Sequence, residues 1–301
     1  MNNQLKGYLL AFLSVIAVSN VYIFSKAALN EISLAQFGTY WFGFGLIWII
    51  LYGIKNKSFQ HLRSFNKSKY TLIITLGFIE IIGTTFFFKA IHTIPNPAIT
   101  SFLNNISPVF VLSLSFLVLG ERLNRLEIIG VFLALSGGFI IGYKGGFDIR
   151  HMFIDGTQYV IMASFMFAIS SVISKKNIVS LSPVLIAFNR TLFLFIFSLI
   201  VLLYQKDTFY IPTSAFTSTF IGSILGPFLT VITGLLALKY IDLSKKSMIS
   251  SMKSLFILVG AYLYFDTFPK PFELMGGLLS IMGVLLILFG KKRLKLKESK
   301  K

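Results

Sequence analysis

The stretch YTLIITLGFIEIIGTTFFF, from Tyr70 to Phe88, contains a single charged residue, Glu80. A helix rises 1.5 Å per residue, so an apolar helix of about 20 residues crosses a hydrocarbon core about 30 Å thick. This stretch therefore predicts a membrane-spanning helix. It also places one carboxylate near the middle of that helix.

Similar apolar runs recur along the 301-residue chain, with short connections between them. The composition agrees, because 55% of the residues are hydrophobic and 13% are charged, whereas about 25% are charged in a typical soluble domain. We therefore predict an all-α membrane protein with ten transmembrane helices. The expected spans are Tyr8–Ala28, Phe37–Ile54, Tyr70–Phe88, Ala98–Leu119, Ile128–Tyr143, Thr157–Ser174, Pro183–Leu203, Phe216–Leu238, Met248–Phe265 and Phe272–Gly290.

The two halves of the chain share a weak sequence pattern. IFSKAALNEIS (Ile23–Ser33) matches VISKKNIVSLS (Val172–Ser182), with Lys26 opposite Lys175. Five spans in each half is an odd number, so the second half would enter the membrane from the opposite side as an inverted-topology repeat. The expected domains are a first five-helix repeat at 1–145, a second at 155–290 and a basic tail at 291–301.

The basic residues gather on one side of the expected bundle. They crowd the connection Lys55–Lys69 and the tail KKRLKLKESKK, and the net charge of the chain is +17. Cytoplasmic connections of membrane proteins carry this excess. We therefore expect a multi-pass protein of the cell membrane, surrounded by the lipid bilayer, with both termini in the cytoplasm. No aromatic and basic surface accompanies the charge, so nucleic acid is not an expected partner.

Glu80 is expected too deep in the bilayer for its side chain to reach water. Insertion scales give a charge at this depth a cost of about 2.5 to 3.5 kcal/mol, so it should face protein or a wet cavity. Three roles stay open: an ion pair with Lys253, a proton acceptor, or a ligand for an ammonium group. Lys253 is the nearest candidate partner by depth, and the two together would suit a zwitterion. Arg190 and Lys175 are instead expected to extend to the lipid headgroups.

Two prolines, Pro108 and Pro227, lie near the middle of their expected spans. Each removes a backbone donor and frees the carbonyl four residues earlier, and lipid tolerates such a break only against protein or a wet cavity. Asn104 and Asn105 share a turn with the first break. Their amides either bond neighbouring helices or line a cavity. Lys26, near the outer end of the first span, is a candidate for a gate or an incoming-substrate contact, with extension to the headgroups as the alternative.

A stripe of small residues marks the expected span Ile128–Tyr143. Gly130, Ala134, Gly138 and Gly142 recur every four residues. Small residues at this spacing let another helix approach closely. We predict that this stripe packs against a neighbouring helix and does not contact a ligand.

The lysine near the end of the first span of each half, the segment NISPVF (Asn105–Phe110) and LGERL (Leu119–Leu123) followed by spaced glycines resemble the EamA family of the drug/metabolite transporter superfamily. The resemblance implies ten helices in a five-plus-five inverted repeat, a central cavity and transport of small metabolites. The second half departs from the family pattern. It has Met252-Lys253 and Phe265-Asp266 where the motif has Ser-Pro and Gly-Glu.

The sequence thus predicts a secondary transporter that moves a small polar, amino-acid-like metabolite by alternating access, and we expect export. An organic-anion or nucleotide-type carrier or exchanger that uses Lys253 and Lys26 is the alternative. An intramembrane enzyme is not expected, because the chain has no cysteine, no glycine-rich phosphate loop and no catalytic constellation. No cofactor or metal is predicted. The expected substrate-binding residues are Glu80, Asn104, Asn105, Lys253 and Lys26.

Two properties of the predicted transporter stay open. The substrate gradient and proton exchange are both candidate sources of energy, and a monomer and a homodimer are both compatible with the pattern.

Overall fold

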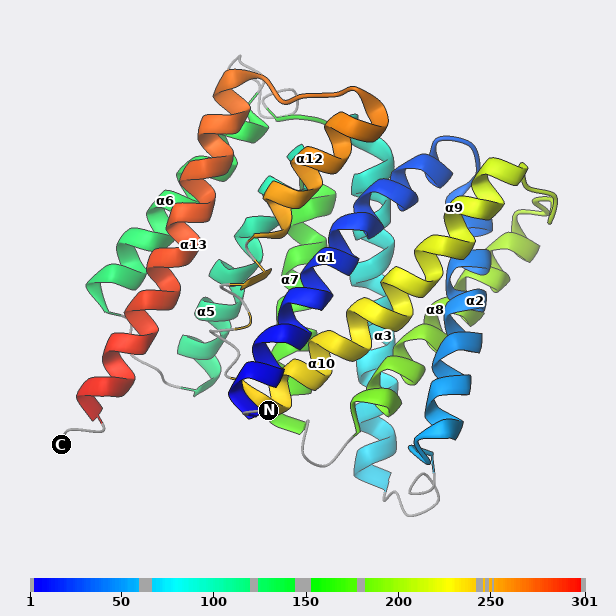
Figure 1. Cartoon of the computed structure of the whole chain (residues 1–301), viewed down its shortest axis with the longest axis horizontal. Coiled ribbons are helices and arrows are strands. Elements are labelled where there is room, and N and C mark those ends of the chain that lie inside the picture. Colours follow the sequence, from blue (N-terminus) through cyan, green and yellow to red (C-terminus); the bar gives the residue numbers. More distant parts are fainter. Residues whose placement is uncertain are drawn as a thin grey trace.

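The computed structural model describes residues 3–59, 67–119, 124–143, 153–177, 182–241, 246, 249–250 and 252–298, without the side chains of 115–119, 175, 288 and 290–298. Every named element in this part of the chain is a helix, and the helices pack side by side (Figure 1). The elements are α1 (Asn3–Leu29), α2 (Leu34–Lys55), α3 (Lys67–Thr93), α4 (Pro97–Leu103), η2 (Asn104–Ile106), α5 (Ser107–Leu119), α6 (Arg125–Gly142), α7 (Thr157–Asn177), α8 (Pro183–Tyr204), α9 (Thr213–Ser223), η3 (Ile224–Thr230), α10 (Val231–Tyr240), α12 (Lys253–Phe265) and α13 (Pro271–Glu298).

Eight helical segments of the described chain are long and apolar enough to cross a membrane. They comprise α1, α2, α3, the α4–η2–α5 segment, α6, α7, α8 and the α9–η3–α10 segment. Two further apolar helices, α12 and the stretch Pro271–Ile287 of α13, are shorter. The all-α membrane class is therefore confirmed. The expected ninth span, Met248–Phe265, is longer than α12, because α12 begins only at Lys253.

The helices form a broad bundle with α6 and α13 at one edge and α2, α8 and α9 at the other (Figure 1). α1 begins and α13 ends at the same end of the bundle, which we call the terminal side. The opposite end, where α1 leads into α2, is the far side.

The largest cluster of buried side chains contains residues of both halves of the chain, with aromatic rings of the first half at its centre. Trp41 of α2 is 1% exposed and packs against Phe37 and Phe88, with ring centroids 4.8 and 5.8 Å away. A Cβ added at Gly222 of α9 would lie 2.0 Å from Cζ3 of Trp41. Only a glycine therefore fits there, and it lets α9 close directly onto the indole ring.

α6 and α13 approach each other through glycines. A Cβ added at Gly130 would lie 2.6 Å from the Gly283 carbonyl oxygen, and one at Gly137 would lie 2.5 Å from that of Gly276. The predicted helix contact is present, but the predicted stripe is wrong at Gly138, where an added Cβ has no atom within 4 Å. Steps of four residues drift about 40° around a helix, so the contact face alternates steps of four and three.

Candidate functional site

A cavity of about 270 Å³ lies between helices of both halves, and its lining includes the last turns of α7 and α10 and the first two turns of α8. We call it the terminal-side cavity. α1 and α3 of the first half and α7, α8, η3, α10 and α12 of the second contribute to its wall. Its polar lining residues are Ser14, Glu80, Ser170, Ser171, Ser174, Arg190, Thr230, Lys246, Ser250 and Lys253.

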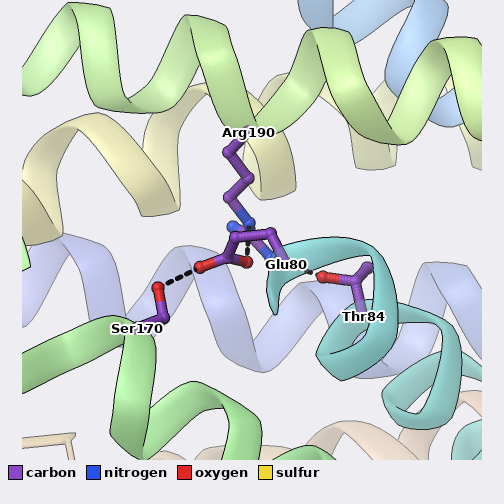
Figure 2. Close-up of polar contacts among 4 residues, drawn as sticks. All are labelled: Glu80, Thr84, Ser170 and Arg190. Atoms are coloured by element: carbon purple, nitrogen blue, oxygen red, sulfur yellow. Dashed lines mark hydrogen bonds and ion pairs between the residues drawn. The ribbon is translucent and has the colours of Figure 1, made fainter. Parts of the chain in front are cut away.

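Glu80 forms an ion pair with Arg190 at the wall of this cavity (Figure 2). Arg190 Nε lies 2.6 Å from Glu80 Oε2, and Ser170 Oγ donates a hydrogen bond to Glu80 Oε1 at 2.5 Å. Arg190 Nη2 also donates to Thr84 Oγ1 at 3.2 Å. The Glu80 side chain is 12% exposed, so it faces protein and cavity, as an intramembrane carboxylate should.

The local sequence brings α7 and α8 close to α3 at this point. A Cβ added at Gly77, one turn before Glu80, would lie 2.4 Å from the Phe193 ring of α8. A Cβ added at Gly83 would lie 3.0 Å from Met166 Cβ of α7. Glycines on both sides of Glu80 therefore let the two helices that carry its partners approach α3.

Of the three roles left open for Glu80, the ion pair with Lys253 is not formed, and the expected extension of Arg190 to the headgroups is wrong. Glu80 pairs with Arg190, whereas Lys253 lies at the first position of α12 and lines the same cavity. Arg190 lies two turns into α8, a depth from which a long side chain can either reach the surface or turn inward. Only the packing of α8 against α3 decides between the two.

Asn104 and Asn105 are buried and bond to neighbouring helices. Asn104 Nδ2 donates to the Tyr22 hydroxyl at 2.9 Å, and its Oδ1 accepts from Ser164 Oγ at 2.7 Å. Asn105 Nδ2 donates to Ser280 Oγ at 3.3 Å. These bonds tie η2 to α1, α7 and α13. The structure thus favours the packing interpretation of the amides, and neither lies among the described lining residues of the terminal-side cavity.

Both expected helix breaks are present. The 3-10 turn η2 ends two residues before Pro108, and Pro227 lies inside the π-helical segment η3. In η3 the Thr230 hydroxyl donates to the Leu225 carbonyl at 2.7 Å, and Ser14 Oγ of α1 donates to the Thr230 carbonyl at 3.0 Å. Thr230 lines the terminal-side cavity. The second helix break therefore adjoins the cavity. Side-chain hydroxyls donate hydrogen bonds to the backbone carbonyls at this break.

Lys26 is 6% exposed and ties α1 to the end of α3. Its Nζ donates to the carbonyl oxygens of His92 at 2.8 Å and Ile94 at 3.0 Å. The last carbonyls of a helix lack partners within the helix, and a cation there also meets the negative end of the helix dipole. Lys26 therefore stabilises this junction on the far side and does not extend to the headgroups. The side chain of its counterpart, Lys175, lies outside the described residues.

Lys26→Met is expected to lower the stability of the protein by about 2 kcal/mol, because it leaves two carbonyls without their charged donor. Thermal unfolding of the purified protein in detergent measures this loss as a lower midpoint. Lys239→Met is the matched control, since Lys239 is an exposed cation in the last turn of α10 and should contribute only about 0.5 kcal/mol. Equal midpoints for the two variants would contradict the role of Lys26.

The terminal-side cavity has an excess of positive charge. Its described lining includes one carboxylate and three basic side chains, and Glu80 is already paired with Arg190. Lys253 then adds positive charge to the cavity, as does the amino end of α12, which begins at Lys253. Such a cavity attracts a carboxylate or another anion. Among the described residues, no group of three or more His, Asp or Glu side chains could hold a metal ion.

One curated protein and one solved structure resemble this chain. The chain is 25% identical over 231 residues to the "Uncharacterized transporter sll1164" of Synechocystis sp. (strain ATCC 27184 / PCC 6803 / Kazusa), a match that covers 73% of this chain and 65% of that relative. It therefore spans just under two-thirds of the relative's length. A crystal structure of a protein with 15% sequence identity matches with a TM-score of 0.67 over 96% of this chain and 98% of the other, which supports the fold alone.

A family model gives the broadest match. The EamA-like transporter family matches twice, at residues 5–143 and 155–289. Together with the eight apolar spans, this match indicates a multi-pass membrane protein. The chain therefore belongs to the EamA-like transporter family.

Proposed function

We propose that the protein is a secondary transporter that moves a small, amino-acid-like metabolite across the cell membrane by alternating access, in the direction of export. The observation that carries this proposal is the charged cavity between the two halves, where Glu80 of α3 meets Arg190 of α8. A polar cavity among apolar helices is costly unless it serves a ligand or an ion pathway. Membership of a transporter family adds to this argument.

Two oppositely inserted halves would suit this function. If α12 and α13 also cross the bilayer, the chain has ten crossings in two sets of five, and the two separate family matches support such a duplication. Their limits are close to the expected domains at 1–145 and 155–290. The shared position of both chain ends (Figure 1) and the basic tail support cytoplasmic termini. The two halves could then rock about the cavity between them.

Lys253 is the expected contact for the carboxylate of the substrate. α12 has 13 residues, which corresponds to about 20 Å and is shorter than the hydrocarbon core. If its far end lies at the membrane surface, its amino end and Lys253 lie at bilayer depth. A half-helix that points its amino end at an anionic group is a recurring feature of transporters. The substrate ammonium group would then compete with Arg190 for Glu80, or bond the serine hydroxyls.

Counterflow in proteoliposomes tests the proposal. Vesicles that contain the purified protein are loaded with a mixture of unlabelled L-amino acids and diluted into a trace of the same mixture carrying tritium. We expect transient accumulation of label above the level in protein-free vesicles. Glu80→Gln should abolish any dependence of the rate on pH if proton exchange supplies the energy. Labelling equal to that of protein-free vesicles for the whole mixture would contradict an amino-acid-like substrate.

The excess of basic side chains in the cavity favours one second candidate, an organic-anion carrier. A mixture of tritiated dicarboxylates in the same counterflow assay distinguishes it. Accumulation of dicarboxylates without accumulation of amino acids would favour this candidate.

Lys253→Met is expected to raise the KM for the transported carboxylate by about tenfold or more, because it removes a charge-assisted bond worth about 1.5 kcal/mol. Initial counterflow rates over a range of solute concentrations measure the change. Lys239→Met removes an exposed cation outside the described cavity lining and should leave the KM unchanged. The same KM in both variants would remove Lys253 from the binding site.

A further inference from the structure

A second cavity, of about 310 Å³, lies between α2, α3 and α8. We call it the far-side cavity. Its wall is largely apolar, with rings from Phe37, Phe42 and Phe88, and it extends to Ser33 and Gln205 at the helix ends. Thr84 lines it at the other end. The proposed substrate site does not include this cavity.

The two cavities are stacked along the same pair of helices. α3 contributes Glu80 to the terminal-side cavity and Thr84, one turn later, to the far-side cavity. α8 contributes Arg190 to the first and Leu194, again one turn later, to the second. Both helices run toward the far side (Figure 1). Along both helices, the lining of the far-side cavity therefore begins one turn beyond Glu80 and Arg190 of the terminal-side cavity.

α3 and α8 both end near the connection from α1 to α2. The carbonyl of His92, in the last turn of α3, accepts a bond from Lys26 near the end of α1. Asp207, just after α8, accepts a bond from Ser33 before α2 at 2.6 Å. The far-side cavity extends to these helix ends, because its lining includes Ser33, directly before α2, and Gln205, directly after α8.

The side chain of Arg190 lies at the junction of the two cavities. Its Nε faces Glu80 at 2.6 Å in the terminal-side cavity, and its Nη2 donates to Thr84, a lining residue of the far-side cavity. Its Cζ lies 6.0 Å from the centre of the Phe167 ring of α7. The guanidinium is therefore held from α3 (Figure 2) and backed by the Phe167 ring of α7.

We propose that the two cavities are successive chambers of one pathway and that the Arg190 side chain is the partition between them. This inference rests on the proposed transport function. A carboxylate in the terminal-side cavity offers the guanidinium an alternative partner to Glu80 and Thr84. An anionic solute thereby lowers the barrier that the bonded arginine presents, whereas a neutral solute of the same size does not.

Cysteine accessibility tests the partition, and the chain needs no prior substitution because it contains no cysteine. Ser171→Cys places a thiol in the terminal-side cavity, and Thr85→Cys places one in the far-side cavity. A membrane-impermeant cationic methanethiosulfonate is applied from either side of oriented vesicles. In the parent protein each thiol is expected to react faster from its own side.

Arg190→Ala is expected to raise the far-side reaction rate of the Ser171→Cys thiol by about tenfold or more, with little change from the terminal side. Ile186→Ala is the matched control, since Ile186 lines the same cavity one turn earlier on α8. It should leave the far-side rate unchanged. Thr84→Val removes the hydrogen bond between Thr84 and Arg190 at nearly constant side-chain volume. It should raise the reaction rate of the Ser171→Cys thiol from the far side by a smaller factor. This variant replaces Arg190→Ala in the test if Arg190→Ala fails to fold.

The inference would be overturned if the Ser171→Cys thiol reacted from the far side at the parental rate in every folded variant that lacks the contact between Arg190 and Thr84. Equal rates in Arg190→Ala and Ile186→Ala would also overturn it. The labelling needs no solute transport, so its outcome is independent of counterflow. Counterflow activity with no change in labelling would refute the partition alone, and altered labelling without counterflow of any tested solute would refute the proposed function alone.

Discussion

Arg190→Met is expected to reduce transport by about a hundredfold or more. The substitution leaves the Glu80 carboxylate, whose side chain is 12% exposed, without its counter-ion at bilayer depth. Removal of one partner of a buried ion pair costs about 3 to 5 kcal/mol, and we expect the lower end because both side chains are partly exposed, 24% for Arg190 and 12% for Glu80. Initial counterflow rates in proteoliposomes measure the loss of activity, and thermal unfolding in detergent measures the loss of stability.

Two further variants separate the structural and functional parts of this effect. Glu80→Gln combined with Arg190→Met removes both charges, so it should recover most of the stability but not the transport. Arg125→Met changes an exposed arginine at the start of α6 and should leave both measurements near those of the parent. Transport by Arg190→Met at the parental rate would remove the ion pair from the transport site.

Gly137→Leu is expected to separate α6 from α13 and to destabilise the fold by about 3 kcal/mol or more. A Cβ at Gly137 would already lie 2.5 Å from the Gly276 carbonyl oxygen and 2.6 Å from the Ser280 amide nitrogen. Both atoms belong to the α13 backbone and cannot move aside as a side chain could. A lower midpoint of thermal unfolding, or loss of the monodisperse peak in size-exclusion chromatography, measures the effect.

Gly138→Leu is the matched control for this prediction. It adds the same side chain at the next position, where an added Cβ meets no atom within 4 Å. Replacement of a glycine in a helix by leucine should even favour the helix by about 0.8 kcal/mol. Similar midpoints for Gly137→Leu and Gly138→Leu would show that the close contact between α6 and α13 does not stabilise the protein.

The class of fold could be predicted from the sequence because length and hydropathy alone determine which segments can cross a bilayer. The stretch Tyr70–Phe88 lies within α3, and the stretch Pro183–Leu203 lies within α8. Pro108 and Pro227 marked both helix breaks, because proline cannot donate the backbone bond that a regular helix requires. These predictions depend on local properties of the chain.

The partners of the polar residues could be predicted only in part. A carboxylate in the middle of the membrane must face protein, and Glu80 does so. The depth of Glu80 does not specify which helix supplies its cationic partner. Arg190, Ser170 and Lys246 were missed as cavity residues. The one signal for Arg190 was its position two turns into its span, where a cation is costly unless it reaches a partner or the surface. The prediction that Gly138 contacts another helix is wrong for a similar reason. The spacing of small residues predicts that a helix has a contact face, but it does not determine which residues turn toward the neighbouring helix.

A stability measurement with paired compounds tests the central claim most directly, namely that the cavity between the two halves binds a solute through its carboxylate. Each amino acid and its carboxamide are added at the same concentration to the purified parent protein and to Lys253→Met, and the midpoint of thermal unfolding is recorded. A ligand that binds only the folded state raises this midpoint. We predict a rise for at least one amino acid and not for its carboxamide, with the rise lost in Lys253→Met. Equal shifts for acid and amide, or an undiminished shift in Lys253→Met, would contradict the account.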